Sequence, residues 1–218
     1  MAGREAAGPQ VLMLGWLTDL SESITAYLRR ADILAKRAHP PCARMPFRTR
    51  WHTIDSAPPR LSADEIDSIE SVIVIFDGHS VQTRFGGRQS IARSRRLRAC
   101  ANEACALTTT TALTVGALRV LLICDARRLP SSRRPDAIRW TRDLAHRISY
   151  ECLVNGLSGH SAAYAVIDTD EDVRDVAEAA VPWHAGHRAE RQRWPLHPVV
   201  SSADVTRARS APRRTPPS

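Results

Sequence analysis

The most restrictive feature of the sequence is the run Ser-Val-Ile-Val-Ile-Phe at residues 71–76. The run is rich in β-branched residues, which favour strands, and the polar residues Glu70 and Asp77 bound it. Because no polar residue alternates with the apolar ones, neither face of such a strand suits water. The run therefore predicts a central strand of a parallel sheet that helices cover on both faces.

Other short apolar segments alternate with helical patterns along the chain. Strands are predicted at residues 10–15, 118–124 and 161–167, and a weaker one at 49–54 within a proline-rich connection. This order of elements predicts an α/β fold with three layers, in which a mostly parallel sheet lies between helices. Functional groups in such sheets gather just beyond the carboxyl ends of the strands.

Capping and breaking residues set the expected ends of the helices. Two predicted N-terminal caps are pairs of residues three positions apart, Asp19 with Glu22 and Ser62 with Glu65. Helix ends are expected at two prolines and at a run of β-branched residues: Pro40, Pro182 and the threonines 108–111.

Charge and composition divide the chain into a body and a tail. The 218 residues suit one domain, placed at residues 10–181 after a flexible start at residues 1–9. The formal net charge is +8, and residues 185–218 hold seven arginines against two acidic residues. Residues 182–218 are also rich in proline and serine, so a basic, disordered C-terminal tail is predicted.

The cysteines and the missing motifs narrow the class of protein. Five cysteines without a recognisable export signal favour reduced thiols and a cytoplasmic protein. No apolar run approaches the roughly 18 residues of a membrane helix, and no phosphate-binding glycine loop occurs, so neither a membrane nor a cofactor is predicted. Zinc is disfavoured as a ligand of Cys100 and Cys105 with His184 and His187, because positions i and i+5 of a helix lie on different faces.

Two strand ends carry groups that together suit nucleophilic catalysis. Gly78 and His79 follow the strand at 71–76, and Cys124 ends the strand at 118–124. If these strands are neighbours, about 4.8 Å apart, both side chains reach the same edge, where the imidazole takes the thiol proton. Backbone amides at Gly78 and Cys124 would then stabilise an oxyanion. Alternatively, His79 caps a turn and Cys124 is a small buried apolar residue.

This pattern resembles that of the caspase-like cysteine peptidases, and among them the bacterial CHAT domains. The resemblance rests on the stretches VIVIFDGHS (72–80) and RVLLICDA (119–126), and it covers about residues 10–181. It implies that Cys124 is the nucleophile of a cysteine endopeptidase and His79 its general base, with the Gly78 amide as an oxyanion contact. No cofactor or metal is implied.

Two departures from the family pattern keep alternatives open. Ser80 follows the histidine where the family usually has glycine, and Asp125 follows the cysteine where small residues and glycine are common. A catalytically inactive interaction domain of the same fold, with a protein partner, is therefore one alternative. A nucleic-acid-associated protein that uses the arginines of residues 93–98 and the tail is another, disfavoured because no aromatic residue interleaves these arginines.

Arginines near the predicted edge bear on the substrate. Arg84, Arg88 and Arg127 lie close to the two strand ends in sequence. As substrate-binding residues, they would favour a protein or peptide substrate with an acidic residue at the cleavage point.

Overall fold

The computed structural model describes residues 8–38, 59–87, 90–186 and 195–199. Its strands form one sheet in the order β2-β1-β3-β4-β5-β6, in which β1 to β5 are parallel and β6 is antiparallel to β5. The strands are β1 (Val11–Leu14), β2 (Ala35–Ala38), β3 (Ser71–Phe76), β4 (Arg119–Asp125), β5 (Ser161–Ile167) and β6 (His197–Pro198).

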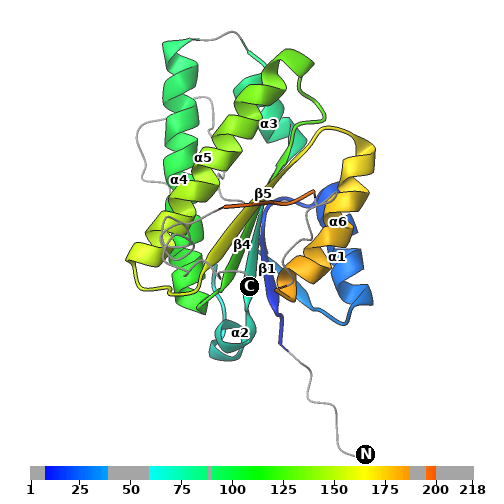
Figure 1. Cartoon of the computed structure of the whole chain (residues 1–218), viewed down its shortest axis with the longest axis vertical. Coiled ribbons are helices and arrows are strands. Elements are labelled where there is room, and N and C mark those ends of the chain that lie inside the picture. The colour runs from blue at the N-terminus through cyan, green and yellow to red at the C-terminus, as the bar shows by residue number, and fades with distance from the viewer. Residues whose placement is uncertain (1–7, 39–58, 88–89, 187–194, 200–218) are drawn as a thin grey trace, which may run out of the picture.

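Helices cover both faces of this sheet, which confirms the predicted three-layer α/β fold (Figure 1). On one face, α1 (Asp19–Arg30) contacts α6 (Asp170–His184). On the other, α4 (Ile91–Val115) packs against α5 (Arg134–Val154), and the short α3 (Gly78–Phe85) contacts both. The short helices α2 (Ala63–Ser68) and η1 (Ser131–Arg133) lie in connections.

The strands divide the apolar core into two layers. In β3, which is buried along its whole length, Val72 and Val74 belong to the core layer beneath α4 and α5. Ile73 and Ile75 belong to the layer beneath α1 and α6. Successive side chains of a strand point to opposite faces, so an uninterrupted apolar run supplies both layers at once.

The first helix differs from its prediction at both ends. Thr18, not Asp19, is the N-cap, because its extended backbone lets its hydroxyl accept the amide proton of Ser21 at 3.2 Å. The helix ends at Arg30 rather than at Pro40, and the chain turns at Asp32, whose φ is 58°. The residues that follow form the edge strand β2, whose sequence Ala-Lys-Arg-Ala carries little apolar signal.

Two expected helix ends are also wrong. The threonines 108–111 lie within α4, where Thr108 and Thr111 are buried, so tertiary packing outweighs the weak helix propensity of threonine. Pro182 lies inside the last turn of α6, which buried Trp183 and His184 hold against the body. The capping box of Ser62 and Glu65 is confirmed. The strand predicted at 49–54 falls outside the described residues.

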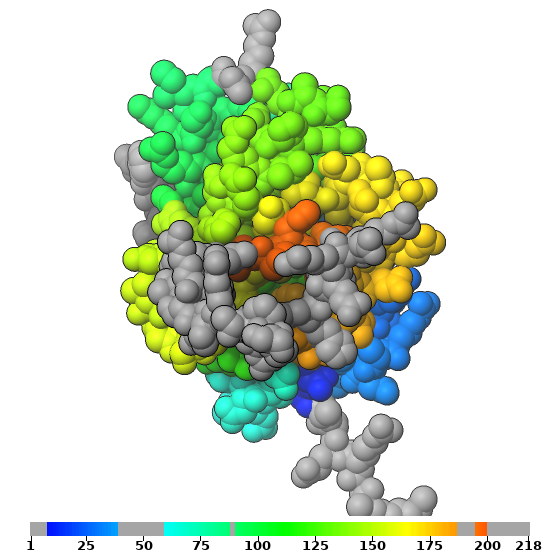
Figure 2. Space-filling model, viewed as in Figure 1, coloured from blue at the N-terminus to red at the C-terminus, as the bar shows by residue number. Residues whose placement is uncertain are grey.

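Part of the predicted tail is ordered. Residues 182–184 continue α6, and residues 195–199 lie at the surface (orange in Figure 2), where the Val199 amide donates to the Ala162 carbonyl at 2.9 Å. His197 stacks on Tyr164 of β5 with ring centroids 5.0 Å apart. The disorder prediction is therefore wrong for these two segments, and residues 187–194 and 200–218 are outside the described part.

None of the described helices combines the length and the apolar composition that crossing a membrane requires.

Gly116 ends α4 in the left-handed region, with φ of 63°, and a Cβ there would meet no atom within 4 Å. Gly116→Ala is therefore expected to lower the free energy of unfolding by about 1 kcal/mol through backbone strain alone. Gly87→Ala is the matched control, because Gly87 also has open space around a Cβ but no positive φ. Urea denaturation of both variants checks this expectation, and equal effects would contradict it.

Candidate active-site edge

The two strand ends singled out from the sequence are neighbours in the sheet. β3 and β4 pair in parallel, with Phe76 opposite Cys124. Gly78 and His79 are the first residues of α3, and Asp77 caps this helix by accepting the Ser80 amide proton at 2.9 Å. The condition on which the predicted dyad depends, that the two strands are neighbours, is therefore met.

The Cys124 side chain points into the core rather than to the edge. It has no exposed surface and belongs with Phe76 and Leu122 to the layer beneath α4 and α5. Burial raises the pKa of the Cys124 thiol to about 12, against the effect of a hydrogen bond with Thr141 of α5. An activated nucleophile needs a lowered pKa, so this environment disfavours the thiolate.

His79, in contrast to Cys124, is exposed to solvent. It lies on α3, where its backbone carbonyl accepts a hydrogen bond from the Thr83 hydroxyl at 2.9 Å. Among the described residues, no hydrogen bond engages the imidazole. The expectation that both side chains reach one accessible edge is wrong, because strand alternation turns Cys124 inward and leaves Asp125 to end the strand.

Arg127 occupies the edge that the thiol does not reach. Its guanidinium binds Asp19 of α1 through two hydrogen bonds of 2.7 and 3.0 Å. It also binds Asp125 at 3.0 and 2.8 Å, and Asp170 of α6 at 2.6 Å. The Arg127 guanidinium therefore links the carboxyl end of β4 to the amino ends of α1 and α6.

The electrostatics of this cluster are favourable for ionised carboxylates. The hydrogen bond from Arg127 holds the pKa of Asp19 below its ordinary value, and its carboxylates raise the pKa of Arg127. Asp19 and Asp170 are the first residues of their helices, where the helix dipole favours negative charge. We refer to Arg127, Asp19, Asp125 and Asp170 as the edge cluster.

The edge cluster opposes the oxyanion role predicted for Gly78. A Cβ built on Gly78 would lie 3.1 Å from Oδ2 of Asp125, so a carboxylate oxygen lies close to this glycine. Oxyanion stabilisation requires hydrogen-bond donors in a site without competing negative charge. A carboxylate beside Gly78 repels the negative charge that a tetrahedral intermediate would carry.

The arginines predicted to bind substrate differ in their surroundings. Arg127 is committed to three carboxylates and does not offer a free guanidinium to an acidic substrate. Arg84 lies in the last turn of α3 and is half-buried. Its backbone carbonyl accepts a hydrogen bond from Nε of Arg93 at 3.1 Å. Arg88 lies outside the described residues.

Within the disfavoured zinc set, the sheet separates Cys105 from His184, and His187 lies outside the described residues. Cys105 belongs to the layer beneath α4, whereas His184 closes α6 on the opposite face and binds Ser71 Oγ through Nδ1 at 2.9 Å. Within the described part of the chain, no cluster of three or more metal-ligating side chains occurs.

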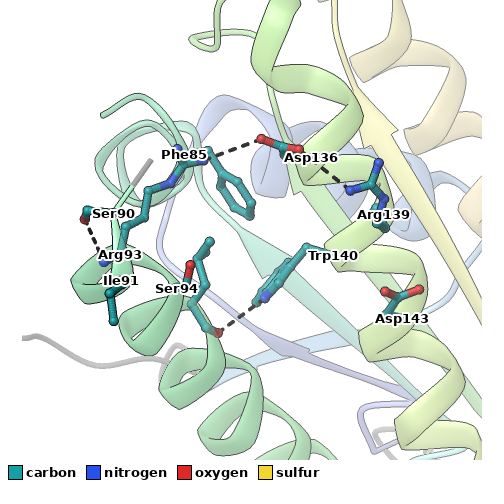
Figure 3. Close-up of a pocket in the computed structure, with 10 residues that line it drawn as sticks. Phe85, Ser90, Ile91, Arg93, Ser94, Asp136, Arg139, Trp140 and Asp143 are labelled. Carbon is teal, nitrogen blue, oxygen red and sulfur yellow. Dashed lines mark hydrogen bonds and ion pairs between the residues drawn. The ribbon is translucent and has the colours of Figure 1, made fainter. Parts of the chain in front are cut away.

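A groove between α4 and α5 was not foreseen from the sequence (Figure 3). It has a volume of about 720 Å³. Its lining combines apolar residues with charged and hydroxyl groups: Phe85, Ile91, Leu97, Trp140, Ser90, Arg93, Ser94, Asp136, Arg139 and Asp143. The sequence signal that indicates it is Trp140, an aromatic residue beside the buried stripe of α5 rather than within it.

Comparisons with protein families, with curated proteins and with solved structures gave no match.

The burial of Cys124 has a direct chemical consequence. In the folded protein at pH 8, we expect Ellman's reagent to modify Cys124 no faster than the protein unfolds, as peptide mapping by mass spectrometry would show. An added cysteine at the exposed position of Ala92 (Ala92→Cys) supplies the fast reference rate. Rapid modification of Cys124 at neutral pH would contradict the buried geometry.

The same pKa shift predicts a dependence of stability on alkaline pH. The neutral thiol is favoured in the folded state, so this contribution is complete below the ordinary pKa of 9.0 and disappears as the pH rises towards about 12. Cys124→Ala removes this titration, so its stability is expected to fall less steeply above pH 9 than that of the wild type.

Arg127→Leu tests the edge cluster, because it leaves buried Asp125 without its cation. We expect a loss of about 2–3 kcal/mol in the free energy of unfolding, measured by urea denaturation. The Asp19 contribution is present above the ordinary pKa of 3.8 and lost as the pH falls through the lowered folded value, so the difference shrinks in acid. Arg174→Leu, at an exposed position of α6, is the control, and an equal loss there would refute the role of Arg127.

Proposed function

We propose that this chain is a non-catalytic interaction domain with a caspase-like α/β scaffold. The observation that carries the proposal is the complete burial of Cys124, whose thiol pKa is raised to about 12. A domain of this kind keeps the layered scaffold and binds a partner protein through its surface, without cleaving it.

Support for the caspase-like scaffold comes from the positions of the two resembling stretches. The first ends β3 and places Gly78 and His79 at its carboxyl end, and the second forms β4, the neighbouring strand. The order of the parallel strands also occurs in other doubly wound sheets. Function therefore depends on the site rather than on the strand order.

The site lacks what peptide hydrolysis by a cysteine requires. A nucleophile needs access to the substrate and a base within hydrogen-bond reach, whereas Cys124 is enclosed and its polar neighbour is Thr141. An oxyanion needs unopposed donors, whereas the Asp125 carboxylate lies beside Gly78. The endopeptidase hypothesis would require β4 to shift by one residue, which would expose one whole set of its core side chains.

A mechanism-based label distinguishes the interaction domain from the peptidase. The full chain, His79→Ala and Cys124→Ser are incubated with a set of peptidyl acyloxymethyl ketones that includes acidic residues at the cleavage position, and intact masses are measured. We expect no adduct on any of the three proteins. His79 is exposed, so His79→Ala is expected to remain folded and to serve as a matched control. An adduct on Cys124 that disappears in His79→Ala would establish a working dyad and overturn the proposal.

A further inference from the structure

The groove between α4 and α5 has an apolar floor that is held in place. Trp140 meets Phe76 and Phe85 edge to face, with ring centroids 5.0 and 5.7 Å apart. Its indole N–H donates to the Leu97 carbonyl at 3.4 Å. In Figure 3 the rings of Phe85 and Trp140 lie between the two helices. The floor is thus formed before any partner arrives, which lowers the entropic cost of binding.

The mouth of the groove exposes an apolar side chain next to uncompensated positive charge. Ile91 lines the groove and is 76% exposed. Arg95 and Arg98 follow it at positions i+4 and i+7, so they are exposed on the same row of the helix, beside the groove but outside its lining. Within the residues that the structure describes, no ion pair engages either arginine.

This concentration of charge is unfavourable for the isolated chain. Arg95 and Arg98 lie three positions apart on one face of α4, where like charges repel each other. Arg93 is the exception on this wall, because it binds the Gly87 carbonyl at 2.9 Å and lies 3.7 Å from the Asp136 carboxylate. Arg95 and Arg98 thus leave a positive rim that complements carboxylates of a partner.

The opposite wall of the groove argues against nucleic acid. Asp136 and Asp143 of α5 both line it beside one arginine, Arg139, so a polyphosphate lying in the groove would meet two carboxylates on this wall. A peptide avoids this conflict, because its acidic residues can be confined to the side that faces α4.

We propose that this groove binds an acidic amphipathic segment of a partner protein. Apolar side chains of the segment pack on Ile91, Leu97 and Trp140, and its carboxylates pair with Arg95 and Arg98. The inference rests on the proposed function as an interaction domain and names the chemical class of the partner. A helix laid into a groove, with anchors at helical spacing, fits these contacts.

Fluorescence anisotropy with the full chain tests this binding. The probe is a fluorescein-labelled peptide of about 14 residues with leucines at positions i, i+3, i+4 and i+7, glutamates on one flank of this leucine stripe and serines at the remaining positions. The comparison probes are the same peptide with lysine in place of glutamate and a labelled oligothymidylate of about 15 nucleotides. We expect binding of the glutamate peptide, weakening when NaCl rises from about 50 mM to about 300 mM, and much weaker binding of the other two probes.

Two matched charge reversals locate the binding site. Arg95→Glu/Arg98→Glu is expected to weaken binding of the glutamate peptide about tenfold. Arg60→Glu/Arg174→Glu makes the same change of net charge at exposed arginines outside the groove, and its affinity is expected to stay within about twofold of wild type. Ile91→Asp, at an exposed position that leaves the core intact, is expected to weaken binding as well. Circular dichroism confirms that each variant is folded.

Each other result overturns the inference. Equal losses in both double variants would mean that net charge alone attracts the peptide, and tighter binding of the oligothymidylate would assign the rim to nucleic acid. No binding of the glutamate peptide at about 1 mM would remove the groove as its site. These results are independent of the label on Cys124: an adduct there refutes the non-catalytic role, whereas missing peptide binding without an adduct refutes only the groove.

Discussion

The burial of β3 and β4 on both faces is the constraint on which the rest of this structure depends. Because side chains alternate along β4, Leu122 and Cys124 must share one core layer while Leu121 and Ile123 share the other. The strand has no freedom to present its thiol to solvent without exposing the remainder of that set. Burial on both faces therefore keeps Cys124 in the core, and Asp125 is the residue that ends the strand at the edge.

That carboxylate in turn determines what gathers at the edge. Asp125 is nearly enclosed and needs a cation, and Arg127, two residues later in the chain, supplies it in a geometry that also binds Asp19 and Asp170. The cluster ties β4 to α1 and α6, which cover the same face of the sheet. Within the cluster, three carboxylates outnumber one guanidinium, and this excess of negative charge opposes the stabilisation of a tetrahedral oxyanion.

The sequence revealed those parts of the fold that depend on strong local patterns. The run at residues 71–76, the strand at 161–167 and the capping box at Ser62 follow from apolar periodicity and cap chemistry alone. The edge strand β2 was missed because Ala-Lys-Arg-Ala has no apolar alternation, and only pairing with β1 makes it a strand. For the site, the adjacency of two strand ends was predictable, but the direction of the Cys124 side chain was not, because it depends on where β4 begins and ends to within one residue.

The length of α4 has its own consequence for the architecture. At 1.5 Å per residue, its 25 residues measure about 37 Å, whereas the seven residues of β4 span only about 23 Å. The helix must overhang the sheet, and its overhanging turns rest on α3 and α5 instead of on strands. The turns of α4 that extend beyond the strands depend on α3 and α5 for their packing. A change in the conformation of these turns is therefore expected to leave the central sheet undisturbed.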